Sequence, residues 1–189
     1  MSAIRLRLKA PMQSWCKDSY WDDEKKTSSF PTRTGLAGMI GCAMGIKRGD
    51  SRLDDLRKLE MYACYTSEYA RMHAVIYKDF QTVRPHHQRY GEKWQRADHA
   101  PLPKWSSKRY KSAGRNEDAI IRRREYVVNG DFTVFIVSDN EELLDKILYF
   151  LDNPVWAYYL GKKSCLPAER VPEGRCKFST EEEKLCIRL

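Results

Sequence analysis

A strongly basic stretch, residues 84–125, sets the main limit on how this chain can fold. It carries twelve Lys or Arg against five Asp or Glu, a net charge of +7 out of +8 for all 189 residues. Five residues that interrupt helices lie within it: Pro85, Gly91, Pro101, Pro103 and Gly114. Because so many Pro and Gly residues prevent a long helix, we expect an arm inserted into the fold.

The composition of this arm predicts a nucleic-acid partner. Large aromatic residues lie among its cations: Tyr90, Trp94, Trp105 and Tyr110. A charge run is ordinarily a solvated loop, but such a loop has no use for tryptophan. Single-stranded nucleic acids stack bases on aromatic faces while Lys and Arg contact the phosphates. The arm is therefore expected to bind RNA or DNA, in agreement with a pI near 9.2.

Outside the arm, apolar side chains recur with the periods of strands and helices, which predicts an α+β fold. Residues 4–9 alternate apolar and basic side chains, so we expect a half-buried strand with one basic face that ends at Pro11. Further strands are expected at residues 61–65, 72–77, 126–128, 132–137 and 186–189, and helices at residues 34–46, 51–59 and 143–151. This order favours a single ferredoxin-like, RRM-related domain over residues 1–189, with the arm inserted at about residues 84–122.

Two local signals suggest how the strands connect. The runs 61–65 and 72–77 follow one another closely and are expected to form a hairpin. Asn129-Gly130-Asp131 is a strong turn signal between the strands on either side of it.

The expected helices carry their own signals. Asp50 or Ser51 can cap the second helix, and Ser138 and Glu141 have the spacing of a capping box before the third. Glycine weakens a helix by about 1 kcal/mol relative to Ala. The four glycines within residues 34–46 therefore indicate tight packing against a sheet or a backbone close to a ligand.

The cysteine pattern argues against metal binding and disulfides. The six cysteines include no C-x-x-C pair and are expected to be reduced thiols: Cys16, Cys42, Cys64, Cys165, Cys176 and Cys186. We predict no metal and no cofactor. The chain also has no apolar run of membrane-spanning length and no signal peptide, so a cytoplasmic protein with no membrane partner is expected.

A short segment after the last expected helix has the features of a phosphate-binding loop. Gly161 allows the backbone to approach a ligand closely, while Lys162, Lys163, Ser164 and free amides suit a phosphate. When this segment is considered alone, an ordinary surface turn with two lysines is the commoner interpretation.

Motifs distributed along the chain resemble one known family. They are Met12-Gln13-Ser14-Trp15, Phe30-Pro31-Thr32-Arg33-Thr34-Gly35, Lys78-Asp79-Phe80-Gln81-Thr82-Val83, Arg124-Glu125-Tyr126 and Tyr159-Leu160-Gly161-Lys162-Lys163-Ser164-Cys165. In this order they are similar to Cas family five of the RAMP superfamily, in the form of the CasD-type subunits of the type I-E CRISPR surveillance complex Cascade. The resemblance covers nearly the whole chain.

This resemblance implies an RRM-like core with a protruding thumb and a non-catalytic role in antiviral defence in a prokaryotic cell. Such a subunit caps the crRNA-bound backbone filament and holds the 5′ handle of the guide. The handle is expected to contact Gln13, Trp15, Arg33, Thr34, Gly35, Gly161, Lys162, Lys163 and Ser164. The arm is expected to reach the neighbouring backbone subunit and guide nucleotides with Arg84, Arg89, Lys108, Arg109 and Lys111. The large target-recognising subunit is expected to dock nearby.

The chain departs from the family pattern in three places. Cys16 stands where Gly is common after the Trp, and Gln81 stands where His is common. The sequence also stops soon after the Tyr-Leu-Gly-Lys-Lys segment, where relatives often run further. The first two departures are compatible with RNA binding. The third means that the resemblance does not define the form of the C-terminal region.

Two other functions are alternatives to a non-catalytic subunit that binds the guide RNA. His86, His87 and His99 lie near Tyr90 and Lys93, and such a set can cleave RNA through its 2′-hydroxyl without metal. Type I-C relatives process their own guide in this way, so a repeat-cleaving endoribonuclease is the alternative. A free-standing RRM-like RNA-binding protein is a more distant one. No catalytic triad, paired-carboxylate metal motif or Walker loop is visible in the sequence.

We predict that the purified protein does not cleave repeat RNA. General acid–base catalysis needs an acid, a base and a charge stabiliser within hydrogen-bond reach, and a breaker-rich arm does not suit a rigid pocket. Labelled repeat RNA incubated with the protein in EDTA should remain intact. A product that ends at the handle boundary, and that is lost in His86→Ala or His87→Ala, would establish the endoribonuclease instead.

Overall fold

The computed structural model describes residues 1–17, 24–83 and 120–189. Most of the basic arm, with its histidines and the predicted RNA-binding cations Arg84, Arg89, Lys108, Arg109 and Lys111, lies outside the described residues. The chain divides into two compact units, one of residues 1–79 and 124–189 and one of residues 80–123. The first unit carries the fold described below, and the single-domain boundary stays a prediction.

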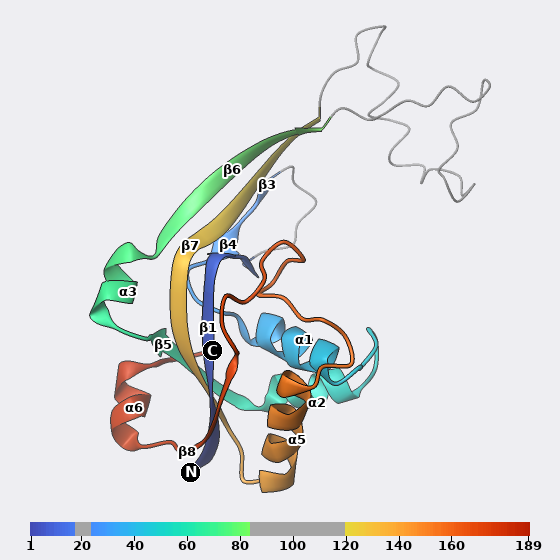
Figure 1. The fold of residues 1–189 in the computed structure, drawn as a ribbon, viewed down its shortest axis with the longest axis vertical. Helices are drawn as coiled ribbons and strands as arrows, with labels where there is room; N and C mark the ends of the chain where they lie inside the picture. Colours follow the sequence, from blue (N-terminus) through green and yellow to red (C-terminus); the bar gives the residue numbers. More distant parts are fainter. Residues whose placement is uncertain (18–23, 84–119) are drawn as a thin grey trace, which may run out of the picture. The chain divides into compact units, whose positions relative to one another are not determined.

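An antiparallel sheet with the strand order β8-β1-β7-β5-β9 forms the centre of this unit (Figure 1). Its strands are β1 (Ser2–Gln13), β5 (Glu60–Tyr65), β7 (Ile120–Val137), β8 (Pro172–Lys177) and β9 (Ile187–Arg188). Strands β3 (Glu24–Lys25) and β6 (Val75–Val83) also pair with β7. A separate small sheet joins β2 (Trp15–Cys16) to β4 (Thr27–Ser28).

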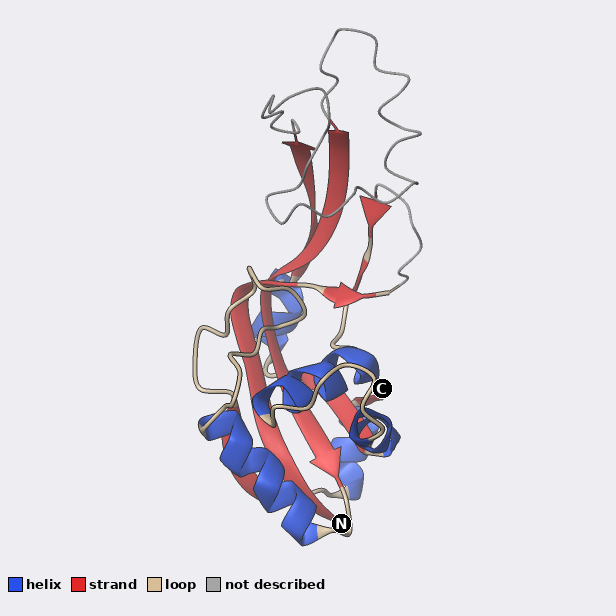
Figure 2. Cartoon of the chain, turned by 90° about the vertical axis from the view of Figure 1, so that its right-hand side faces the viewer, coloured by secondary structure: helices blue, strands red, loops and turns tan. Residues whose placement is uncertain are grey.

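Helices lie on both sides of the sheet. The helices α1 (Arg33–Ala43), α2 (Arg52–Lys58) and α5 (Glu141–Asp152) cover one face (Figures 1 and 2). The short helices α3 (Glu68–His73) and α6 (Thr180–Leu185) lie on the other side. Within the described residues, none of the helices is both long and apolar enough to span a membrane.

The alternation of β1 assigns its side chains to two different environments. Ile4, Leu6 and Leu8 are fully buried in the main core, beneath the helical face. The intervening Arg5, Arg7 and Lys9 form the predicted basic face, but each cation has an acidic partner. Arg7 pairs with Asp131 at 2.8 Å, Lys9 with Glu169 at 2.7 Å, and Arg5 with Glu173. This face is therefore locally neutralised rather than free for a polyanion.

Two predicted breaks in the central strands are wrong. β1 does not end at Pro11, and Asn129-Gly130-Asp131 does not form a turn, because β1 and β7 both continue through these positions. The pairing passes from Ala10 opposite Gly130 to Met12 opposite Val128 without a change of register. Pro11 has no N–H to donate, and Asn129, with a φ of 56°, lies at the same level of the ladder. The Asn-Gly signal thus marks a local distortion of a continuous strand.

The predicted hairpin is also wrong. Residues 61–65 lie in β5 as expected, but Met72 and His73 belong to α3, which Ser67 caps by accepting the amide N–H of Ala70 at 3.1 Å. Strand β6 starts only at Val75, and both β5 and β6 pair with β7 rather than with each other. A helical turn between the two strands removes the short connection that a hairpin requires.

Helix ends differ from the predicted ones in detail. The cap of α5 is Asn140, whose Oδ1 accepts the amide N–H of Leu143 at 2.9 Å, so the capping box predicted from Ser138 is wrong. For α2, Ser51 takes the cap position while Asp50 accepts the amide N–H of Arg52 at 3.0 Å. Strand β8 and helix α6 were not predicted, whereas the closing strand within residues 186–189 is confirmed as β9.

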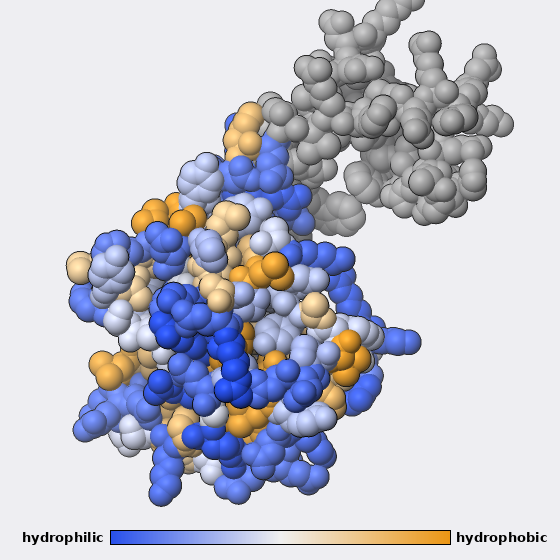
Figure 3. All heavy atoms as spheres, viewed as in Figure 1, coloured by the Kyte–Doolittle hydropathy of each residue, from blue (hydrophilic) through white to orange (hydrophobic). Residues whose placement is uncertain are grey.

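Most of the visible surface is hydrophilic, and apolar residues occur there in separate small groups (Figure 3).

The glycines inside α1 differ in their surroundings. A Cβ on Gly41 would lie 2.4 Å from Leu53 Cδ2 of α2, whereas nothing lies within 4 Å of a Cβ on Gly38. The predicted tight packing of a helical glycine is therefore confirmed for Gly41.

This difference predicts unequal effects of two alanine substitutions. Gly38→Ala should raise the free energy of unfolding by about 0.5–1 kcal/mol, because alanine favours helix. Gly41→Ala should lose most or all of this gain, because the end of the Leu53 side chain must rotate away from the new methyl group. Urea unfolding of both variants measures the effect. Equal stabilisation by both substitutions would contradict the close contact between α1 and α2.

Candidate functional site

A tight loop between α5 and β8 carries the lysine pair singled out in the sequence. The amide N–H of Leu160 donates to the Cys165 carbonyl at 2.8 Å, and the amide N–H of Cys165 donates to the Lys162 carbonyl at 2.9 Å. Leu160 and Cys165 are buried in the main core. Both ends of the loop are therefore anchored, and its tip, residues 162–164, is held in a defined place.

Gly161 joins this loop to the residues that follow β1. Its φ is 92°, and a Cβ at this position would lie 1.7 Å from the backbone carbonyl oxygen of Ser14. The amide N–H of Ser14 in turn donates to the Leu160 carbonyl at 3.1 Å. The close approach expected of Gly161 is thus an approach to the chain's own backbone.

Gln13 and Trp15 flank Ser14, and both side chains are fully buried. Gln13 Nε2 donates to the carbonyls of Leu8 at 2.9 Å and Gly130 at 2.8 Å, while Trp15 Nε1 donates to Gln13 Oε1 at 3.0 Å. These side chains were predicted to contact the handle. With their hydrogen bonds satisfied inside the core, they position the Ser14 backbone and present no polar group to a ligand.

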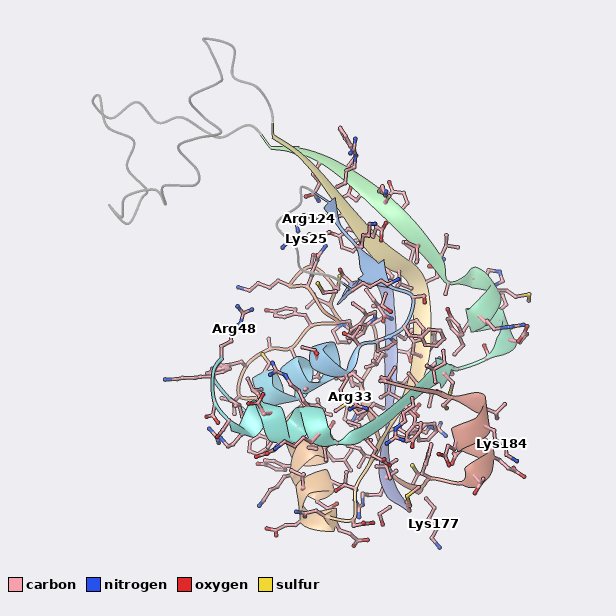
Figure 4. All side chains as sticks on the ribbon, turned by 180° about the vertical axis from the view of Figure 1, so that it is seen from behind. Lys25, Arg33, Arg48, Arg124, Lys177 and Lys184 are labelled. Atoms are coloured by element: carbon pink, nitrogen blue, oxygen red, sulfur yellow. The ribbon has the colours of Figure 1, made fainter. Side chains whose placement is uncertain are left out.

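The predicted residues of the α1 start have separate roles. Thr32 caps the helix by accepting the amide N–H of Gly35 at 3.3 Å, and a Cβ on Gly35 would lie 2.9 Å from Trp15 Cε3. Thr34 is exposed. Arg33 donates from Nη2 to the Leu189 carbonyl, and Figure 4 shows it well apart from Lys25 and Arg124. The structure therefore does not gather Arg33 into the cluster described next.

Among the predicted binding residues that the structure describes, two have a buried side-chain nitrogen without a hydrogen-bond partner, Arg33 at Nε and Lys162 at Nζ. Arg33 still donates through Nη2, whereas the Lys162 ammonium donates to none of the described residues. Its Nζ lies 4.2 Å from the centroid of the Tyr126 ring. The Nζ atom is buried and has no hydrogen-bond partner among the described residues. Burial lowers the pKa of the Lys162 ammonium, and the nearby charges of Arg124 and Lys25 lower it further.

We call Lys25, Arg124, Tyr126 and Lys162 the Lys162 site. Arg124 and Tyr126 come from β7 and Lys25 from β3, which pairs with β7. The carboxylate closest in sequence, Glu125, is directed elsewhere: its Oε2 accepts the amide N–H of Thr27 at 3.1 Å and its Oε1 lies 3.9 Å from Lys78 Nζ. The site thus combines three cations from separate segments without using Glu125 to neutralise them.

The loop tip adds further donors. In the part of the chain that the structure describes, the amide N–H groups of Lys162, Lys163 and Ser164 have no acceptor. Lys163 and Ser164 are exposed. Consecutive free amides beside cations form an anion-binding concavity, and an ammonium offers three donors that an aromatic ring does not satisfy. The arrangement is suited to a phosphate group.

Sequence reasoning placed Gly161, Lys162, Lys163 and Ser164 in one loop, and the structure agrees. It missed three members of the Lys162 site, namely Lys25, Arg124 and Tyr126. Arg124 and Tyr126 lay within a motif that carried the family resemblance, so a signal for them was present. Lys25 stood in a polar run with no pattern of its own. Among the described residues, no group of three or more His, Cys, Asp or Glu side chains is arranged to hold a metal ion.

A mixed core of helices and antiparallel strands that brings cations together beside a loop with free amides, as the described residues do, defines a class of proteins suited to a polyanionic ligand. The family model described as CRISPR-associated protein (Cas_Cas5) matches residues 3–184. Because this match covers nearly the whole chain, the chain belongs to the Cas5 family. The family resemblance drawn from the sequence motifs is confirmed.

Individual relatives agree with this assignment. The CRISPR system Cascade subunit CasD of Escherichia coli (strain K12) is 27% identical over 192 residues, which cover 97% of this chain and 75% of that subunit. A chain of a solved CRISPR RNA-guided surveillance complex has a TM-score of 0.70 and 25% identity, over 97% of this chain and 66% of that one. A crystal structure of a Cas protein, with a TM-score of 0.62 and 22% identity over 95% of this chain and 68% of that one, shows the same fold. The chain spans about two thirds of the length of these solved chains.

The contact between Gly161 and Ser14 predicts a large effect of a single methyl group. Gly49 also has a positive φ, of 84°, but nothing lies within 4 Å of a Cβ there, so it is a matched control. Gly49→Ala should lower the free energy of unfolding by about 1–2 kcal/mol through backbone strain alone. Gly161→Ala should lower it by about 1–3 kcal/mol more, because the Ser14 backbone must move. Equal losses in urea unfolding would show that the two segments are not in contact.

Proposed function

We propose that the chain is a non-catalytic crRNA-binding subunit of a type I-E-like CRISPR Cascade complex. In this role it holds the 5′ handle of the guide and caps the backbone filament in antiviral defence. The family match, the similarity to the Cascade subunit CasD and the likeness to a chain of an RNA-guided surveillance complex support this proposal. Such a complex works in the cytoplasm of a prokaryotic cell, where the guide RNA is made.

The observation that carries the proposal is the buried, unpaired ammonium of Lys162. Partial burial without an acceptor penalises the charged form, and Arg124 and Lys25 add to the penalty. The Tyr126 ring and the charge of Asp79 offset only part of this penalty, and a bound anion would offset more of it. An RNA phosphate supplies both the negative charge and the acceptors that the Lys162 ammonium and the loop amides lack.

The order of the elements supports a ferredoxin-like, RAMP-type core as the finer description of the fold. Strand β1, helix α1, strands β5 and β7, helix α5 and strand β8 follow the β-α-β-β-α-β order of that motif. The strands β8, β1, β7 and β5 lie side by side in one antiparallel sheet. The inserted arm is then the thumb, and we propose that its cations contact the guide and the backbone subunit, with the large target-recognising subunit nearby.

Similarity to a Cascade subunit favours RNA holding over the repeat-cleaving alternative. The two proposals differ in what the protein carries when it is isolated. A tagged chain purified from its host should bring with it other Cascade subunits and a guide RNA with a uniform 5′ end. Recovery of the chain alone, without RNA or partners, would exclude the structural role.

The Lys162→Met variant tests the site, with the RNA recovered in that experiment as the ligand. Loss of one contact to a single-stranded phosphate should reduce the slope of log affinity against log salt by about 0.7. At pH 7 the free energy of unfolding should be unchanged or higher, because the substitution removes an unpaired, partly buried charge. Lys184→Met is the matched control and should alter neither quantity, because Lys184 is exposed and lies well apart from Lys25 and Arg124 in Figure 4.

The pH dependence of stability supplies a second readout. Because the folded-state pKa of Lys162 is lowered from 10.5, the unfolded chain binds more protons at pH values between the two. The parent protein should therefore gain stability as the pH rises through the folded-state pKa towards 10.5, and Lys162→Met should lose this gain. A variant that is less stable than the parent at pH 7 and binds RNA with an unchanged salt slope would identify Lys162 as structural.

A further inference from the structure

Three half-buried thiols lie on the face of the sheet opposite α1 and α5, away from the Lys162 site. Cys64, Cys176 and Cys186 pack against a second, smaller core cluster beside α6. The members of that cluster are Ala3, Tyr62, Phe135, Val137 and Phe178. The proposed function uses none of these thiols.

The register of the sheet places two of the thiols opposite each other. Strand β5 pairs antiparallel with β9, with Tyr62 opposite Arg188 and Ala63 opposite Ile187. The next step of this register sets Cys64 opposite Cys186, whose extended backbone (φ −102°, ψ 152°) joins α6 to β9. Directly opposed residues of an antiparallel pair have Cβ atoms about 4.5–5.5 Å apart. The two Cβ atoms of a disulfide are about 3.5–4.5 Å apart, so only a small movement would be needed to form the bond.

Cys176 shows that position in the sheet, and not burial, distinguishes this pair. It is half-buried and packs against the same cluster, but it lies on β8 opposite Ala3 of β1. Strands β1 and β7 separate β8 from β5, which corresponds to about 14 Å at the ordinary strand spacing. Cys176 is therefore out of reach of Cys64 while sharing its surroundings.

We propose that Cys64 and Cys186 are a redox pair that low-molecular-weight disulfides, such as oxidised glutathione, convert to an intramolecular disulfide. The bond would fasten the C-terminal segment to β5. All six cysteines are expected from the sequence to be reduced thiols, and the pairing of β5 with β9 changes that expectation for these two.

The chemistry of the pair is asymmetric. A hydrogen bond from the Cys186 thiol lowers the pKa of the Cys64 thiol, and the same contact raises the pKa of Cys186. The Cys64 thiolate attacks one sulfur of oxidised glutathione, the glutathione S–S bond breaks, and one glutathione thiolate leaves. Cys186 then loses its proton and attacks the Cys64 sulfur of the mixed disulfide, and the second glutathione leaves. Two protein thiols are oxidised by two electrons, and the two protons end on two glutathione thiols.

The segment that this bond would hold is attached by few other interactions. Strand β9 comprises two residues, the amide N–H of Leu189 donates to the Met61 carbonyl at 2.9 Å, and Arg188 pairs with Glu60. The Leu189 carbonyl also accepts a hydrogen bond from Arg33 at the start of α1. Without this segment β5 would present an open edge, which is a site for unwanted strand pairing. Oxidation would therefore lock a short strand over the edge of the sheet.

The experiment compares the full chain before and after treatment with oxidised glutathione, followed by removal of the reagent. We expect an intact mass lower by two hydrogen atoms and a peptide map in which Cys64 is linked to Cys186. The melting temperature should rise by roughly 4–16 °C and return to its starting value with dithiothreitol. Cys176→Ser should behave like the parent, whereas Cys64→Ser and Cys186→Ser should lose both the link and the shift.

A link between Cys64 and Cys176, a stable glutathione adduct in place of the bond, or unchanged thiols would each overturn the proposal. So would a Cys64–Cys186 bond that leaves the melting temperature unchanged, because the segment would then not need fastening. The peptide map of the parent protein is decisive even if a serine variant fails to fold. Membership of a Cascade complex is unaffected by any of these outcomes.

Discussion

The buried amide of Gln13 connects the centre of the sheet to the loop that carries Lys162. Its Nε2 group donates to the carbonyls of Leu8 and Gly130, next to the level at which Pro11 faces Asn129 and the ladder loses a donor. Its Oε1 atom accepts the indole N–H of Trp15. Buried polar groups stabilise a fold only when they are satisfied, and this one side chain satisfies groups on both central strands and in the segment that follows. The position of Ser14, and through Gly161 that of the loop tip, depends on this arrangement.

Much of the fold follows from the periodicity of the sequence. The helical patterns that predicted α1, α2 and α5 and the alternation of Ile4, Leu6 and Leu8 are confirmed, because burial of one face dictates them. The errors arose where a local signal had two uses. Asn129 and Gly130 suit a tight turn, but they equally accommodate a distortion in a strand whose partner contains a proline. Which use prevails depends on the pairing of distant segments, and a local pattern contains no information about that pairing.

The sequence located the candidate loop but not the contacts that its residues make. The motif around Gly161 located the loop, yet it did not distinguish a glycine that admits a ligand from one that admits the Ser14 backbone. Likewise, the motif predicted handle contacts for Gln13 and Trp15, but it did not reveal that both side chains are buried with their hydrogen bonds satisfied. Lys25 and Arg124 act on Lys162 because β3 and β7 bring them together, and only the folded sheet reveals that proximity.

The docking of Gly161 on Ser14 also has a consequence for the order of events during synthesis. Ser14 and Gly161 are far apart in the sequence, so the two meet only after the whole segment between them has left the ribosome. Contacts between such distant segments form late in folding, after local helices and neighbouring strands. The cluster of cations around Lys162 is therefore absent from a nascent chain. A chain that has not yet reached Gly161 therefore cannot assemble the Lys162 site.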